Sequence, residues 1–175
     1  MTADDPAPRA SLPSARSVLS QRSPVLFLLA VTATTMASIA QVTALGVQVF
    51  ALTGRELDLG LLGLAEFAPA LLLAIPAGAL ADRFDRRLMM GIGLAGEVAC
   101  SVGLAVVTAR GSATFGVLLA LVVVFGVFRA LTAPAARALP ATLVAPEALP
   151  RIVPLFSASW QFGLIAGPVL GGFLY

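Results

Sequence analysis

The chain of 175 residues contains no histidine and only one cysteine, Cys100. The absence of histidine argues against a histidine metal site, a Ser-His catalytic pair and a histidine proton relay. A single cysteine excludes an intrachain disulfide, and we interpret Cys100 as a small buried apolar side chain. The sequence also lacks a Gly-x-x-x-x-Gly-Lys loop for binding ATP phosphates. These absences argue against an enzyme and an ATP-driven pump, and we expect neither a cofactor, a metal nor a nucleic-acid partner.

Charge is scarce as well. Charged residues make up 11% of the chain and hydrophobic residues 59%, whereas soluble domains carry roughly 25% charged residues. Lysine is absent, so all 11 basic residues are arginines. This composition predicts an integral membrane protein whose first partner is the lipid bilayer.

Five apolar segments predict an all-α membrane fold. Each reaches the ~20 residues that a helix needs to cross ~30 Å of hydrocarbon. Residues 1–23, rich in proline, serine and alanine, are predicted to form a disordered cytoplasmic tail. Prolines between residues 137 and 154 interrupt the helical pattern before the last segment. The predicted helices cover about residues 25–52, 57–80, 88–107, 113–136 and 155–175.

The arginines predict the orientation in the membrane. With the N-terminus inside, eight arginines fall on the cytoplasmic side, Arg129 lies within a span, and only Arg55 and Arg110 lie in outer loops. This bias predicts a cytoplasmic N-terminus. A signal peptide cleaved after Ser38-Ile39-Ala40 is the alternative for the first segment, but apolar residues continue to Leu52.

A short charged turn connects the second and third segments. Arginines after a helix end are common cytoplasmic anchors, but Gly78 lies four residues before Asp82 and would allow another backbone to approach closely. The pattern Gly-x-Leu-Ala-Asp-Arg-x-x-Arg-Arg resembles the signature loop between helices 2 and 3 of the major facilitator superfamily (MFS). The resemblance implies a cytoplasmic latch between two six-helix halves, although Asp85 stands where the family usually has glycine. The matching positions are Gly78, Leu80, Asp82, Arg83, Arg86 and Arg87.

The fifth segment carries a second pattern. Gly163, Gly167 and Gly171 recur every four residues on one helix face, which is also an ordinary packing device in membrane bundles. Together with Pro168 and Gly172 they resemble the antiporter motif of MFS exporters, in the helix where that family carries it.

A weaker match lies in the fourth segment. Arg129 begins a stretch that resembles the family's helix 4 pattern Arg-x-x-Gln-Gly, from which Thr132 and Ala133 depart. Residues 134–140 are similar to siderophore and macrolide exporters of the same superfamily. Two roles stay open for Arg129, namely a place in a cavity and snorkelling to the cytoplasmic interface.

Four polar side chains lie deep in the apolar segments. Glu66 and Glu97 are each about nine residues into a predicted helix, ~13 Å deep, where a carboxylate is costly unless it is paired or faces water. Either one is a candidate proton carrier or a structural hydrogen-bonding group. Gln41 and Gln48, seven residues apart, are predicted either to line a polar cavity or to bond a neighbouring helix.

The resemblance implies the first five helices of a six-helix MFS N-terminal bundle in the bacterial plasma (inner) membrane. We interpret the chain as a truncated part of a proton-coupled exporter of small molecules such as drugs or siderophores, with the proton gradient as the energy source. MFS transporters bind substrate between two halves, so a C-terminal half or another chain is the expected partner. The alternative is a non-transporting membrane fragment or scaffold that only packs with partner helices.

Overall fold

The computed structural model describes residues 20–76, 79 and 84–174, and within these ranges the chain is helical with no strand. The predicted all-α class is therefore confirmed. Residues 1–19 of the predicted tail lie outside the described part. The elements are α2 (Arg22–Thr53), α3 (Glu56–Leu72), α5 (Arg86–Ala109), α6 (Phe115–Ala138), α7 (Pro140–Leu143), the 3-10 turn η1 (Pro146–Ala148) and α8 (Leu149–Leu174).

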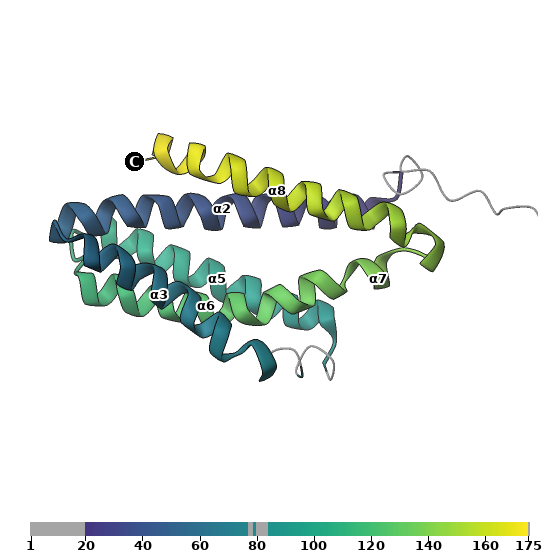
Figure 1. The fold of residues 1–175 in the computed structure, drawn as a ribbon, viewed down its shortest axis with the longest axis horizontal. Helices are drawn as coiled ribbons and strands as arrows, with labels where there is room; N and C mark the ends of the chain where they lie inside the picture. The colour runs from purple at the N-terminus through teal and green to yellow at the C-terminus, as the bar shows by residue number, and fades with distance from the viewer. Residues whose placement is uncertain (1–19, 77–78, 80–83, 175) are drawn as a thin grey trace, which may run out of the picture.

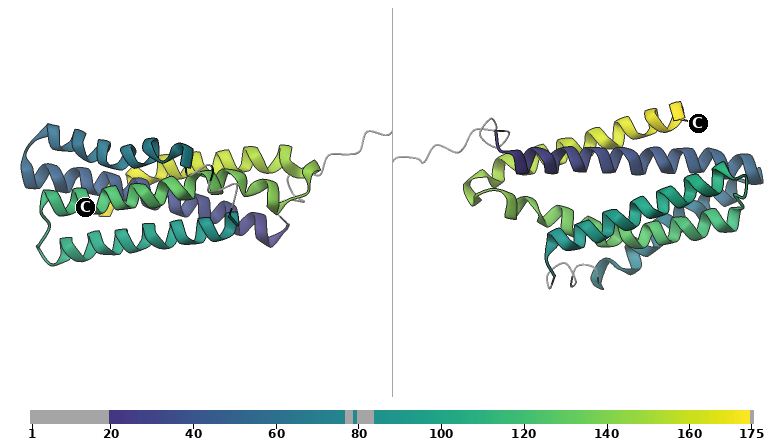
Figure 2. Two further views of the ribbon diagram at one scale, coloured as in Figure 1. Left: turned by 90° about the horizontal axis from the view of Figure 1, so that it is seen from below. Right: turned by 180° about the vertical axis from the view of Figure 1, so that it is seen from behind.

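The helices form two groups that run along the long axis of the molecule (Figure 1). In the first group, α8 lies beside α2 along most of its length. In the second group, α6 is central and packs against both α5 and α3. The view from behind in Figure 2 shows the same two groups.

Two tight turns reverse the chain at one end of the bundle. Gly54 ends α2 with a left-handed φ of 64°, and its N–H donates to the Phe50 carbonyl oxygen at 2.8 Å. Gly111 adopts a φ of 65° in the turn between α5 and α6. Glycine reaches positive φ without steric cost, so these two residues allow the antiparallel pairing of α2 with α3 and of α5 with α6.

Four helices in the described part are long and apolar enough to cross a membrane, which makes the chain a multi-pass membrane protein. Of the five predicted spans, α3 is too short: it has 17 residues, and a helix needs ~20 to cross the hydrocarbon. It was predicted to continue to about residue 80, but α3 ends at Leu72, and residue 73 forms a turn before residues 74–76, which are helical again. Pro76 lacks the N–H that would bond the Leu72 carbonyl, and its ring would clash with that carbonyl in an uninterrupted helix.

The last helix also differs from the prediction. α8 begins at Leu149 and contains Pro154, whereas the predicted helix began near residue 155. Pro150 lies in the first turn, where a helix tolerates proline because those N–H groups have no partner in any case. Pro154 removes one further hydrogen bond close to the start of α8, and the helix continues beyond it.

Asp85 begins α5. Its side chain accepts hydrogen bonds from the N–H groups of Arg87 at 2.7 Å and Leu88 at 3.3 Å. Such a cap typically contributes ~0.5–2 kcal/mol, which gives a physical reason for aspartate at the position where the family pattern has glycine. Of the charged turn, residues 77–78 and 80–83 lie outside the described part, so the latch assigned to Gly78 and Asp82 stays a prediction.

The glycines of the last segment lie at the contact between α8 and α2. A Cβ atom added at Gly163, Gly167 or Gly171 would lie 2.6–2.7 Å from α2 atoms, namely Thr35 Cβ, Ile39 Cβ and the Ala40 carbonyl oxygen respectively. Gly172 faces open space instead. Three of the four motif glycines thus allow close packing of the two helices.

Candidate functional site

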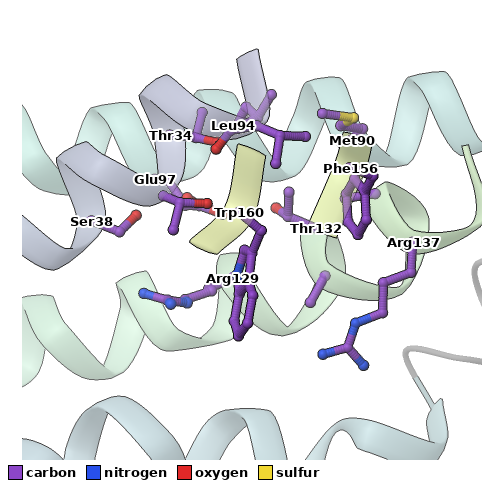
Figure 3. Close-up of a pocket in the computed structure, with 14 residues that line it drawn as sticks. Thr34, Ser38, Met90, Leu94, Glu97, Arg129, Thr132, Arg137, Phe156 and Trp160 are labelled. Atoms are coloured by element: carbon purple, nitrogen blue, oxygen red, sulfur yellow. The ribbon is translucent and has the colours of Figure 1, made fainter. Parts of the chain in front are cut away.

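A cavity of about 200 Å³ opens between the two groups of helices. Its wall combines residues from α2, α5, α6 and α8, and it is largely apolar near Met90 and Phe156. Its polar side chains come from three helices, with Thr34 and Ser38 on α2, Glu97 on α5, and Arg129 and Thr132 on α6 (Figure 3). The polar groups therefore converge inside the bundle rather than at its ends.

Glu97 is the most enclosed charged side chain at this site. It projects from α5 with only 8% of its surface exposed. Its Oε1 atom is buried and has no hydrogen-bond partner among the residues that the structure describes. Buried polar atoms are nearly always hydrogen-bonded, so this oxygen is a candidate contact for a ligand or a site for a proton.

Two glycines set the position of Glu97. A Cβ atom added at Gly93 would collide with the Thr132 side chain, and one added at Gly96 would collide with the Phe128 ring. Because neither glycine has a side chain, α5 and α6 approach closely. This close approach brings Glu97 beside Thr132 of α6.

Arg129 forms an ion pair with Glu66. The distance between Arg129 Nη1 and Glu66 Oε1 is 3.1 Å, and the two side chains are 32% and 21% exposed. Gly126, one turn before Arg129, lets α3 approach, since a Cβ atom there would lie 2.7 Å from the Glu66 carbonyl oxygen. Of the two roles left open for Arg129, the structure favours the inward one, because the guanidinium is held by a neighbouring helix.

Arg129 thus interacts with the carboxyl groups of both Glu66 and Glu97. Arg129 lines the same cavity as Glu97 and acts on it electrostatically, but its direct partner is Glu66. A single cation offsets one carboxylate, so the second carboxyl group requires a proton or another cation to balance its charge. The arrangement can therefore exchange a proton or bind a positively charged ligand at Glu97.

Hydroxyl groups complete the polar wall, and the sequence analysis missed them. Thr34 and Ser38 of α2 and Thr132 of α6 line the cavity, and the latter two are 9% exposed. The sequence did contain one indication of this polar wall: Thr34 and Ser38 lie four residues apart and therefore share one helix face.

The two glutamines of α2 have different surroundings. Gln48 Nε2 donates to Thr108 Oγ1 of α5 at 2.9 Å, so it makes the interhelical bond that was one of its two predicted roles. Gln41 lines a small separate pocket of about 10 Å³ together with Glu66. Neither glutamine lines the cavity beside Glu97.

Comparison with known proteins gives one match. The family model described as Major Facilitator Superfamily matches residues 22–175. No curated protein and no solved structure matches the chain. The family match begins at the first residue of α2 and covers every described helix.

Proposed function

The chain belongs to the major facilitator superfamily, and from this premise we propose that it is part of a proton-coupled exporter of small organic molecules such as drugs or siderophores. Members of the family are transmembrane transporters. The observation that carries the proposal is the buried carboxyl group of Glu97, which lines a cavity inside the bundle and has an oxygen without a partner in the described part of the chain. A transporter driven by protons requires a group of this kind within the membrane.

The direction of transport is inferred from α8. The stripe of Gly163, Gly167 and Gly171, followed by Gly172 and interrupted by Pro168, resembles the antiporter motif of exporters. The close contact of this stripe with α2 supports a role in holding the bundle together. We propose export on the strength of that resemblance.

The two glutamates have different proposed roles. Glu66 holds Arg129 at 3.1 Å, and an ion pair favours the charged form of both partners. Glu97 has a free oxygen beside the cavity. We assign the coupling proton to Glu97, and the structural ion pair to Glu66 and Arg129.

Alternating access in this family takes place between two halves of the transporter. The described helices belong to one such half, so further helices from the same polypeptide or from a second chain would complete the transporter. The charged turn at residues 78–87 is the proposed place for a latch with that second half.

Transport is tested with a complete transporter that contains this chain, in inside-out membrane vesicles with an acidic interior. The expected result is that added ethidium accumulates inside and that protons leave at the same time, because the two fluxes are coupled. A protonophore should abolish the accumulation. If cationic, neutral and anionic compounds all fail to cause proton release, the non-transporting scaffold becomes the better explanation.

The proposed cytoplasmic N-terminus is tested by cysteine labelling in intact cells. Arg86→Cys and Arg110→Cys are introduced separately into a chain that carries Cys100→Ala. Because the turn at Arg86 is inside in the proposed orientation, an impermeant maleimide should label position 110 directly and position 86 only after permeabilisation. The reverse pattern would overturn the orientation.

A further inference from the structure

We propose that the cavity beside Glu97 binds the protonated amine of a small, partly apolar molecule, and that the ammonium group donates its hydrogen bonds to Glu97. This proposal rests on the proposed transport function and deepens it, because it names the chemical class of the substrate. The starting point is Glu97 Oε1, a buried acceptor with no partner among the described residues.

The Thr34 hydroxyl of α2 also acts as an acceptor. It donates its proton to the Ala30 carbonyl oxygen at 2.7 Å. A hydroxyl group has one proton and two lone pairs, so Thr34 faces the cavity with lone pairs only. An ammonium group carries three donors and no acceptor, which complements a wall of this kind.

An anion is the competing ligand, because Arg129 and Arg137 also line the cavity. The charge of Arg129 is offset by Glu66 at 3.1 Å. Arg137 is exposed and lies eight residues further along α6, ~12 Å away at 1.5 Å per residue. Glu97 has no such ion-pair partner in the described part of the chain, so the unbalanced charge deepest in the cavity is negative.

The rest of the wall suits an apolar body attached to the amine. Trp160 and Phe156 of α8 and Leu94 of α5 line the cavity, and an indole ring also attracts cations. A volume of about 200 Å³ lies below the ~300–1,000 Å³ of pockets for drug-sized ligands. The cavity therefore takes a small amine, or the amine-bearing end of a larger molecule.

Trp160 provides a direct measurement of binding, because it is the single tryptophan of the chain and it lines the cavity. The 175-residue chain is placed in lipid nanodiscs and titrated with three probes of similar shape: phenylethylammonium, phenylethanol and phenylpropionate. A charge-assisted hydrogen bond is stronger than a neutral one, so we expect the ammonium probe to change the Trp160 emission with a Kd at least about tenfold lower than that of the alcohol. The anionic probe should bind most weakly.

The same titration is repeated on two glutamate variants. Glu97→Gln keeps the shape of the side chain and removes its charge, so the Kd of the ammonium probe should rise to that of the alcohol. Glu147→Gln is the matched control, since Glu147 is exposed in η1, and it should leave all three Kd values unchanged. If Glu97→Gln fails to fold, the comparison of the three probes on the unaltered chain still tests whether the cavity prefers an amine.

Three results would overturn the proposal: equal Kd values for ammonium and alcohol, tighter binding of the anion, or an ammonium preference that persists in Glu97→Gln. The assay measures binding alone. If the amine does not bind but proton-driven export is observed, only the amine-binding proposal is wrong. If the amine binds but no transport is observed, the binding site is supported and the proposed transport function is wrong.

Discussion

Replacing Arg129 with glutamine is expected to lower the free energy of unfolding of the chain by about 2 kcal/mol. The substitution leaves the Glu66 carboxylate without its partner at 3.1 Å, inside a bundle where α3 and α6 pack closely. Breaking a fully buried pair from one side costs ~3–5 kcal/mol. The side chains are 32% and 21% exposed, and this exposure justifies the lower figure. Unfolding by SDS in mixed micelles, followed by circular dichroism, measures the change.

A double-mutant cycle separates the ion pair from other effects of the substitution. Glu66→Gln in the Arg129→Gln background removes the stranded carboxylate, so we expect the double variant to recover at least half of the loss. Arg151→Gln is the matched control, because Arg151 is exposed on α8, and its effect should stay within about 0.5 kcal/mol. Strict additivity in the cycle would show that the ion pair contributes nothing.

Much of the fold could be predicted from the sequence because the bilayer imposes a minimum length on each apolar helix. The helices α2, α5, α6 and α8 all lie where apolar segments were predicted. The end of α3 was harder to predict, because proline is tolerated inside some membrane helices and ends others. Pro69 and Pro154 lie within helices, whereas α3 ends before Pro76.

The site was predicted only in part. The depth of Glu66 and Glu97 in apolar segments predicted that these side chains are enclosed, because depth depends on position along one helix. For Arg129 the sequence left a place in a cavity and snorkelling to the interface both open. The pairing of Glu66 with Arg129 could not be predicted in this way. These residues are 63 positions apart, and their contact depends on the rotation and spacing of two helices that Gly126 allows to approach. The placement of Thr34 and Thr132 on the wall of the same cavity as Glu97 depends on helix packing for the same reason.

In the complete transporter, Glu97→Gln is expected to abolish uphill export driven by a pH gradient. One-to-one exchange with protons converts each pH unit into about tenfold accumulation, so a gradient of about two units drives up to ~100-fold accumulation in the unaltered transporter. Glutamine cannot release a proton, and the variant should therefore reach no more than the equal concentrations seen with a protonophore. Accumulation in inside-out vesicles measures this ratio.

Downhill movement distinguishes loss of coupling from loss of transport. Glutamine resembles the protonated carboxyl group in shape and charge, so Glu97→Gln should still carry substrate down its gradient at concentrations high enough to offset weaker binding. Glu66→Gln is the informative comparison, because the carboxyl group of Glu66 is held by Arg129 at 3.1 Å rather than left with a free oxygen beside the cavity. We expect Glu66→Gln to lower the amount of folded transporter while the remaining molecules keep their coupling. Normal uphill export in Glu97→Gln, with uncoupled transport in Glu66→Gln, would reverse the two assignments and place the proton on α3.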